Sequence, residues 1–490
     1  MSLPFGIKST AFTSPEAVFL ELYSSIDNVD PTSRANVAPL PHALKTEYDE
    51  LLKLDDGKKI ARELLRSLNQ PFEKRIIIAR ILGVMSAINR AFEPIHPRTS
   101  ASVRAYYLPK WLENARNLRT MKGYYASSAE NFLIPKGPLL RLPREENQAC
   151  ANYIPDLFSY LSVVPQRTKE NNRDIFISIK TICSDDIDGV SGPAEIGAEE
   201  ILFVPVAEKV GELDLRVESA FAGGTKFYNT RLAPDVVPSD RILGVLKQEP
   251  NADILSAPEL VIDEENADAL VHALKKEGRK LTKLLLAGSG STRDVDDNNM
   301  AWNEARVFNG IGELLWSQRK IWPAGLKPGH VEQYGIEDPA QSLTLEKNAS
   351  GNSMTVADLD GFGRCVVLIC QDVQAMPLSF DIVSHFQPDW VFVPILDQGA
   401  TYNGWAHQRV FELSAHSQSR FLISCSRALK SRKSADELGH GLAVGPKSAL
   451  DPDDISRACN LVKAVSPESP SFGKMNWKKS DWIRSKFTSS

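Results

Sequence analysis

The spacing of hydrophobic residues changes along this chain, and that change most constrains its fold. Residues 14–130 place apolar side chains at three- and four-residue intervals, which predicts helices. From residue 172 apolar and polar residues alternate in RDIFISIKTI, as they do in a half-buried strand. From residue 239 onward, short apolar segments alternate with amphipathic segments of helical period. This alternation predicts an α/β fold for the second part of the chain.

A chain of 490 residues is too long for one compact core, so we expect at least two domains. Residues 1–170 are predicted to form a mostly helical N-terminal domain of unknown role. Residues 171–466 are predicted to form the second domain, with a core at about 200–465. Residues 467–490 read as a basic and aromatic C-terminal tail. A packed arm or a solvated tail explains this composition more simply than docking on nucleic acid or an acidic partner.

Composition narrows the classes of function. A net charge of −5 and a pI of about 6.0 argue against a dedicated nucleic-acid binder. The six cysteines form no CxxC pair, which argues against zinc-ribbon and dithiol redox motifs, and their scattering suits a reducing compartment. The N-terminus resembles no secretory signal, and no run of 18 apolar residues occurs. We therefore expect a cytoplasmic protein without membrane association.

Three residues with catalytic potential each follow an apolar segment, where α/β proteins place reactive groups. Glu259 follows ADILSAP, and partial desolvation there would favour a proton acceptor. Lys320 follows LLWSQR and could stabilise an oxyanion and hold a nearby thiol as thiolate. Cys370 ends the run CVVLIC and could act as a nucleophile if a base or a cation lies beside it.

Each of these residues also has a simpler interpretation. Glu259 could be a solvated loop carboxylate, and Lys320 a surface lysine beside Arg319. Cys370 could be a buried structural cysteine, the usual fate of free thiols and the one we assign to Cys365. His407 and His416 stand too far apart on a predicted helix for a compact metal site, so we predict no metal.

The order and local sequence of these three residues resemble the carbon–nitrogen hydrolase (nitrilase) superfamily. In that family one strand ends in Pro-Glu, as residues 258–259 do here. A later strand ends in Arg-Lys before a proline-containing loop, as in residues 319–323. A third has apolar residues before Ile-Cys-x-Asp or Ile-Cys-x-Glu, as in residues 368–372. The spacings between the three motifs also fit, and the resemblance covers roughly residues 200–465.

Weaker marks agree with this resemblance, although three features depart from it, one of them a segment before Glu259, residues 213–237, that is too long for a single strand and loop. The marks are Glu332 at the place of the family's second glutamate, Asn303 before a hairpin, Pro377 after the cysteine, and Trp405, Arg409 and Glu412 on one helix. The family's asparagine after the following strand is Ser426 here. The loop QDVQAMPLSF after Cys370 lacks the residues typical of known amidase or nitrilase branches. These departures bear on the substrate, not on the three catalytic candidates.

The resemblance implies a mechanism. Glu259 would be the general base, Cys370 the nucleophile, and Lys320 with the backbone N–H of Gln371 the oxyanion partners. Glu332 would orient Lys320 as a supporting residue. No metal or organic cofactor is implied. The expected substrate is a small amide, carbamoyl compound or nitrile.

The resemblance also implies an α-β-β-α sandwich and a homo-oligomer. An active hydrolase of non-peptide C–N bonds is the preferred function. A regulatory or partner-binding protein that keeps this fold with little activity, or an N-acyltransferase, remain alternatives. The N-terminal domain could bind a protein partner.

Overall fold

The structure is a computed structural model of the chain. It describes residues 13–35, 40–69, 73–98, 107–140, 154–183, 196–218, 226–279, 281–334, 343–429, 433, 437–447, 456–463, 471–478 and 483–484. The chain divides into two compact units. The first comprises Met1–Arg167 with Ile179–Thr181, and the second Thr168–Ser178 with Ile182–Ser490.

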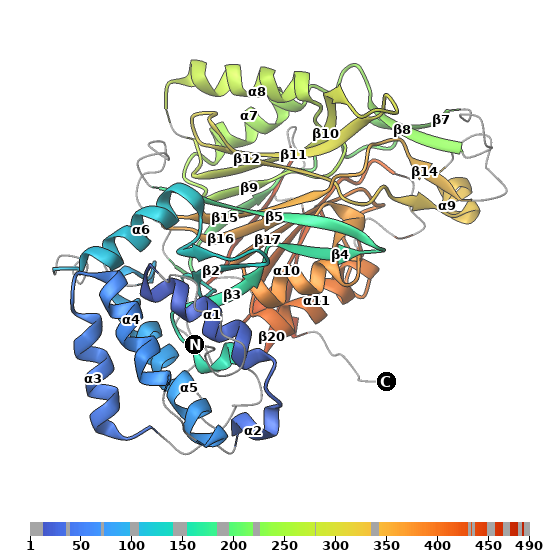
Figure 1. The fold of residues 1–490 in the computed structure, drawn as a ribbon. Helices are drawn as coiled ribbons and strands as arrows, with labels where there is room; N and C mark the ends of the chain where they lie inside the picture. The colour runs from blue at the N-terminus through green and yellow to red at the C-terminus, as the bar shows by residue number, and fades with distance from the viewer. Residues whose placement is uncertain are drawn as a thin grey trace. The chain divides into compact units, whose positions relative to one another are not determined.

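Helices dominate the described part of the first unit (Figure 1). They are α1 (Pro15–Asp27), α2 (Pro31–Ala35), α3 (His42–Leu52), α4 (Gly57–Leu68), α5 (Lys74–Ala91) and α6 (Lys110–Lys122), with short turns η2 (Glu93–Ile95) and η5 (Ile154–Leu157). An antiparallel sheet adds β1 (Ala126–Ser127), β2 (Asn131–Pro135) and β3 (Leu161–Pro165). The helical spacing buries one face of each longer helix, as at Phe19 and Leu64, in one hydrophobic core.

The second unit contains two large sheets. The six-stranded sheet has the order β12-β11-β10-β9-β6-β21. Its strands are β6 (Glu200–Phe203), β9 (Ile254–Ser256), β10 (Leu284–Val295), β11 (Ala301–Asn309), β12 (Leu314–Arg319) and β21 (Gly473–Asn476). The nine-stranded sheet has the order β22-β20-β19-β18-β17-β16-β15-β5-β4. Its strands are β4 (Arg167–Glu170), β5 (Arg173–Ile182), β15 (Ser353–Leu359), β16 (Gly363–Val367), β17 (Trp390–Ile395), β18 (Arg420–Cys425), β19 (Gly441–Pro446), β20 (Arg457–Val462) and β22 (Ile483–Arg484).

Helices cover the outer faces of these two sheets in Figure 1. Helices α7 (Pro238–Gln248) and α8 (Glu264–Glu277) share a hydrophobic core with β9 and β10. Helices α10 (Leu378–Phe386) and α11 (Trp405–Ser417) lie along the nine-stranded sheet. Ser256 on β9 and Ser424 on β18 are hydrogen-bonded at 3.1 Å, so the inner faces of the sheets meet. The predicted α/β class is confirmed, and full burial of β17 and β18 explains their continuous apolar runs.

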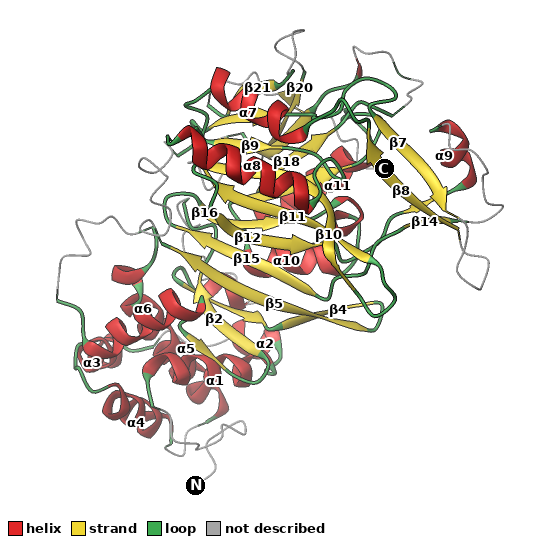
Figure 2. Ribbon diagram, turned by 90° about the horizontal axis from the view of Figure 1, so that it is seen from above, coloured by secondary structure: helices red, strands yellow, loops and turns green. Residues whose placement is uncertain are grey.

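A smaller four-stranded sheet lies to one side of the large sheets, together with α9 (Pro328–Gln333) (Figure 2). Its order is β13-β14-β8-β7. The strands are β7 (Leu213–Glu218), β8 (Lys226–Leu232), β13 (Gly325–Leu326) and β14 (Thr344–Glu346). The segment from β7 to β8, which is too long for a single strand and loop, is therefore an antiparallel hairpin of this extra sheet.

Part of the predicted C-terminal tail belongs to the six-stranded sheet. Strand β21 pairs with β6, and Trp477 is buried with 1% exposure. The Arg420 guanidinium lies 3.5 Å from the Trp390 ring centroid and 5.3 Å from that of Trp477. Arg420 also pairs with buried Glu199 at 2.8 Å. The composition of the tail thus reflects packing over residues 471–478, whereas residues 479–482 and 485–490 of the predicted tail lie outside the described residues.

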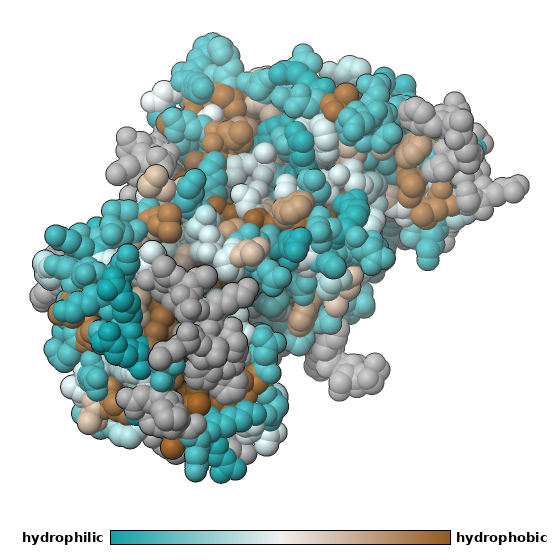
Figure 3. Space-filling view, in the orientation of Figure 1, coloured by the Kyte–Doolittle hydropathy of each residue, from teal (hydrophilic) through white to brown (hydrophobic). Residues whose placement is uncertain are grey.

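On the surface, apolar residues are interspersed with hydrophilic ones on the face drawn in Figure 3. Single exposed apolar side chains such as Tyr107 and Met121 are ordinary for a protein surface. Among the described residues no helix is both long and apolar enough to cross a bilayer.

Candidate active site

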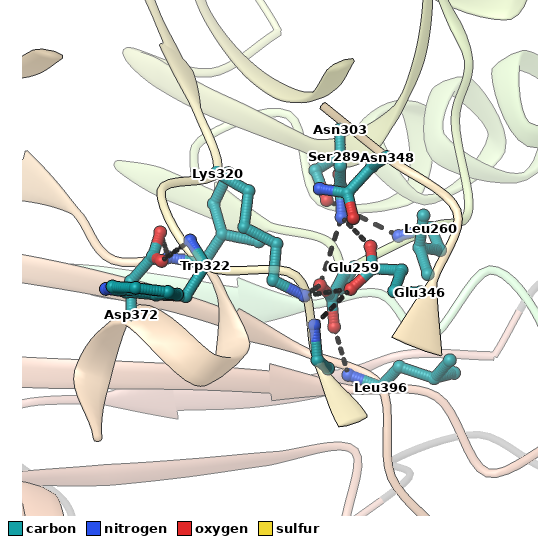
Figure 4. Close-up of polar contacts among 12 residues, drawn as sticks. Glu259, Leu260, Ser289, Asn303, Lys320, Trp322, Glu346, Asn348, Asp372 and Leu396 are labelled. Carbon is teal, nitrogen blue, oxygen red and sulfur yellow. Dashed lines mark hydrogen bonds and ion pairs between the residues drawn. The ribbon is translucent and has the colours of Figure 1, made fainter. Parts of the chain in front are cut away.

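Glu259 and Lys320 meet in one buried site of the second unit (Figure 4), and the charges of both act on the thiol of Cys370. Glu259 follows β9, Lys320 directly follows β12, and Cys370 opens the short turn η7 (Cys370–Val373) beyond β16. Their exposures are 1%, 0% and 7%. The interpretations as a solvated carboxylate and a surface lysine are therefore wrong, while Cys365 is fully buried as predicted.

Lys320 lies between two carboxylates, as Figure 4 shows. Its Nζ donates to Glu259 Oε1 at 2.6 Å and to Glu346 Oε2. Asn303 Nδ2 joins the same two carboxylates, at 3.0 Å to Glu259 and 2.9 Å to Glu346. The other oxygen of Glu259 accepts the backbone N–H of Leu396 at 2.9 Å. This network fixes the position of Lys320 and of the two carboxylates, because each of these three groups has more than one hydrogen-bond partner.

The assignment of Glu332 as the residue that orients Lys320 is wrong. Glu332 lies on α9 and is exposed, whereas the second carboxylate beside Lys320 is that of Glu346 on β14. Glu346 is 3% exposed and also accepts the backbone N–H of Ala324 at 3.0 Å. It was missed because β14 spans only three residues and pairs with β8, far away in the sequence. Both glutamates follow Lys320 in the chain, so their order in the sequence could not show which of them contacts Lys320.

Sequence reasoning also missed Tyr228 on β8. Tyr228 and Glu346 are register partners in the parallel β8–β14 pair, and Tyr228 is 3% exposed. Burial and the nearby Glu346 carboxylate raise the pKa of Tyr228 well above its usual value. The extra sheet thus contributes a carboxylate and a neutral phenol to the surroundings of Lys320. No motif marks this tyrosine in the sequence.

The acidic residue two positions after Cys370 is Asp372, and its contacts explain why an acid stands there. It is fully buried, and its carboxylate accepts the N–H groups of Ile321 at 3.1 Å and Trp322 at 2.9 Å. It also accepts the N–H of Ile369 at 3.3 Å. One side chain therefore links the loop after Lys320 to the turn that carries Cys370. Burial raises the pKa of Asp372 to about 7, although Lys320 and these N–H groups oppose the shift.

The backbone at Cys370 is unusual. Its φ of 48° lies in the left-handed region, which costs a non-glycine residue about 1 kcal/mol or more. The strain turns the chain sharply from β16 into η7, so that Gln371 stands at the second position of this turn. The first N–H groups of a helical turn have no acceptor within the turn. The arrangement is compatible with the role predicted for the Gln371 N–H.

The thiol of Cys370 is neutral in the resting site. Burial raises its pKa well above the usual value, and the Glu259 charge adds to the effect more than Lys320 offsets it. The Cys370 thiol in turn acts to lower the pKa of the Glu259 carboxylate, against the larger effect of burial. Burial also raises the pKa of Glu259, which suits a proton acceptor. Burial and the Glu259 charge thus act against a resting thiolate, and Lys320 acts in its favour.

Lys320 itself stays charged. Burial alone would lower its pKa, but the carboxylates of Glu259 and Glu346 raise the pKa well above its usual value. A fixed cation in a water-poor site interacts strongly with any negative charge that develops beside it. No group of three or more His, Cys, Asp or Glu side chains suited to a metal occurs among the described residues.

The helix α11 supports the turn after Cys370. Arg409 donates to the carbonyl oxygen of Val373 at 3.1 Å and to Ser379 Oγ at 2.9 Å. Glu412 pairs with Arg409 at 2.7 Å. Pro377 lies between the two anchored residues. The marks at Arg409, Glu412 and Pro377 are thus explained by packing around the nucleophile turn, while Ser426 bonds the backbone oxygen of Ala207.

Solved structures similar to this chain include members of the nitrilase superfamily. Saccharomyces cerevisiae Nit3, of branch 10, is 14% identical, with 57% of this chain and 89% of that chain covered and a TM-score of 0.35. A cysteine-to-alanine mutant of the amidase from Nesterenkonia sp. AN1, in complex with butyramide, is 12% identical, with coverages of 58% and 92% and a TM-score of 0.36.

Glutamine-dependent NAD⁺ synthetase from Acinetobacter baumannii is 13% identical, with a TM-score of 0.33; 47% of this chain and 38% of that chain are covered. No protein-family model and no curated protein matches the sequence. Because the identities and TM-scores are low, the function proposed below depends on the residues of the site.

Proposed function

We propose that the second unit is a cysteine hydrolase that cleaves a non-peptide C–N bond in a small amide, carbamoyl compound or nitrile. The observation that carries this proposal is the meeting of Glu259, Lys320 and Cys370 from three separate strands in one buried site. The thiol lies beside a carboxylate, and that carboxylate is hydrogen-bonded to a fixed ammonium. A nucleophile, a base and a cation are thus brought together. A structural cysteine needs neither partner.

In the first half of the reaction, Glu259 takes the thiol proton as the sulfur attacks the carbonyl carbon of an amide. A C–S bond forms and the C=O electron pair moves to oxygen. The Lys320 ammonium and the Gln371 N–H stabilise this oxyanion. When the carbonyl re-forms, the C–N bond breaks and Glu259 returns the proton to the leaving nitrogen. The products are an amine or ammonia and a thioester on Cys370.

In the second half, a water molecule loses a proton to Glu259 and attacks the thioester carbon. The C–S bond breaks, the carboxylic acid leaves, and the proton on Glu259 returns to the Cys370 sulfur. Every proton is thus carried by one carboxylate, and the raised pKa of Glu259 favours its role as proton acceptor. No step calls for another titrating side chain.

The proposal includes the finer features of the fold. We assign the second unit to an α-β-β-α sandwich, with α7 and α8 on one outer face and α10 and α11 on the other. The separate helical domain at 1–170, the homo-oligomer and the cytoplasmic location remain predictions. The hydrolase domain at 171–466 would extend to β21, because that strand completes its sheet.

A turnover assay tests the proposal. The full chain is incubated with panels of primary amides, carbamoyl compounds and nitriles, and ammonia release is measured. We expect release by wild type and by Cys365→Ser, and none by Cys370→Ser, since the charges of both Glu259 and Lys320 act on Cys370. Absence of release by wild type across all panels, or release that survives Cys370→Ser, contradicts the proposal. Added primary amine separates hydrolysis from acyl transfer, because transfer yields the substituted amide.

A further inference from the structure

A further carboxylate, that of Asp397, follows the end of β17 beside the proposed active site. Asp397 directly follows Leu396, whose N–H bonds Glu259 at 2.9 Å and also interacts with the Cys370 sulfur. Adjacent Cα atoms lie about 3.8 Å apart. Asp397 therefore directly follows a residue that contacts Glu259, and Tyr334, which bonds Asp397, is also within range of the Cys370 charge. None of the three catalytic roles uses it.

The partners of Asp397 are neutral donors. Trp405 Nε1 donates to Oδ2 at 2.8 Å, the Gln398 N–H to Oδ1 at 2.7 Å, and Tyr334 Oη to Oδ1 at 3.5 Å. Among the described residues, no lysine, arginine or histidine forms an ion pair with it. The nearby basic groups have other partners, since Arg427 interacts with Glu208 and Lys433 bonds Thr401.

The charges around the sulfur therefore sum to an excess of negative charge. Lys320 is shared by Glu259 and Glu346, which together outnumber it. Asp397 adds a further negative charge that no described cation neutralises. Burial and the Asp397 charge, followed by the Cys370 sulfur, raise the pKa of Tyr334 above its usual value, so its phenol remains a donor. A bound anion would be repelled here, and a bound cation would be stabilised.

The surroundings of Asp397 match the recognition of a cationic group. The Tyr334 phenol and the Trp405 indole both contact the carboxylate, so a carboxylate and two aromatic side chains occur together. Carboxylates bind ammonium and guanidinium groups by charge-assisted hydrogen bonds, and aromatic faces attract the same cations. The donors also hold the carboxylate in place, so little ordering would be needed on binding.

We propose that Asp397, with Tyr334 and Trp405, determines specificity by binding a cationic group of the substrate, an ammonium or guanidinium a few bonds from the scissile C–N bond. This inference rests on the proposed function for the identity of the reaction. It selects amino- or guanidino-substituted amides and carbamoyl compounds over acidic ones. It assigns no chemistry to Asp397, which positions the substrate only.

The test measures the charge preference of Cys370 without any turnover. The full chain is treated with iodoacetate, iodoacetamide or 2-bromoethylammonium, and alkylation of Cys370 is followed by mass spectrometry. Each rate is divided by that of a free thiol with the same reagent. We expect wild type to prefer the cationic over the anionic reagent, and Asp397→Asn to reduce this ratio by about tenfold, the effect of removing one charge at close range.

Two variants and one reagent control the measurement. Asp397→Glu keeps the charge and should keep most of the preference. Asp360→Asn removes an exposed carboxylate in the turn between β15 and β16 and should leave the ratio unchanged. The neutral iodoacetamide reports whether the site still folds in each variant. If Asp397→Asn keeps the wild-type ratio, or if wild type prefers iodoacetate, the inference is wrong.

A turnover arm separates this inference from the proposed function. Primary amides of equal chain length ending in an ammonium, a methyl or a carboxylate group are compared. Hydrolysis of all three at equal kcat/KM overturns the role of Asp397 while supporting the proposed function. Hydrolysis of none overturns the proposed function, and the alkylation ratios still decide whether the site selects cations.

Discussion

At the scale of single residues, the site must stabilise charged groups that are buried. Lys320 has no exposed surface, and a lone buried ammonium would be very unfavourable. Glu259 and Glu346 offset this cost, and Asn303 holds both carboxylates in register with the ammonium. The same arrangement surrounds Cys370, whose pKa burial and the Glu259 charge raise. In the proposed reaction, one network would serve both the stability of the site and the transfer of the thiol proton.

Removal of the buried ammonium should be costly. In Lys320→Met, two carboxylates remain buried beside each other without their cation, and we expect a loss of about 3 to 5 kcal/mol in the free energy of unfolding. Urea titration of the full chain measures it. Lys347→Met is the matched control, because its partially exposed pair with Glu218 is worth about 1 kcal/mol or less. Equal losses in the two variants would contradict the buried network.

At the scale of elements, the site depends on how strand ends are connected. The Asp372 carboxylate joins the loop after β12 to the turn after β16, and the extra sheet supplies Glu346 and Tyr228. Neither connection is local in the sequence. The catalytic candidates are therefore positioned by parts of the chain that carry no chemistry themselves.

Asp372 allows a test of this connection. In Asp372→Asn, an NH₂ group replaces one oxygen and faces backbone N–H donors, so the loop and the turn should shift apart. A displacement of about 1 Å can slow a reaction by about a hundredfold. We expect thioester formation on Cys370 to slow by about a hundredfold. Rapid quenching and mass spectrometry measure this rate, and the far-UV circular dichroism should be unchanged. A wild-type rate would show that Asp372 does not position the nucleophile.

The helix α1 permits a pH test in the first unit. Burial raises the pKa of Glu16 from 4.5 to about 7, and its Oε2 has no hydrogen-bond partner among the described residues. A folded-state pKa above the unfolded one gives stability that is present below pH 4.5 and is lost as pH rises through 7. The free energy of local opening of α1 is measured by amide exchange, corrected for intrinsic rates. It should therefore decrease by about 3 kcal/mol at most from pH 5 to pH 8. Glu16→Gln should abolish the trend, and its persistence would contradict this.

The sequence predicted the central strands of the second unit because several of them, such as β17 and β18, are buried on both faces and read as continuous apolar runs. It also located Glu259, Lys320 and Cys370, since each follows such a run. Glu346 could not be located, because its short strand is defined by pairing with β8 and not by its own pattern. The pKa of Cys370 could not be predicted either, because its largest cause is burial, which depends on the packing of the folded site.

At the scale of the whole molecule, chain segments far apart in the sequence complete the second unit. Strand β21 lies at the edge of the six-stranded sheet, and Trp477 packs against Arg420 and Trp390. The six-stranded sheet, whose strand β9 leads to Glu259, is thus completed by β21, a strand from far along the chain. The basic and aromatic composition of this segment has a structural explanation.

Loss of this packing should destabilise the second unit. Trp477→Ala removes a buried indole, and we expect a decrease of about 3 to 5 kcal/mol in the free energy of unfolding by urea titration. Lys478→Ala, at the exposed neighbouring residue, should change it by about 0.5 kcal/mol or less. A Trp477→Ala variant as stable as wild type would show that the segment is not part of the fold.

The central claim is that Glu259 carries the proton between the Cys370 thiol and the leaving nitrogen. The most direct test is the mass of Cys370 after rapid quenching with an amide substrate found in the turnover assay. Wild type should show a transient acyl adduct on this residue, and Glu259→Gln should form it at least about a hundredfold more slowly, within the range that acid–base catalysis supplies. An adduct that forms in Glu259→Gln at the wild-type rate would contradict the account.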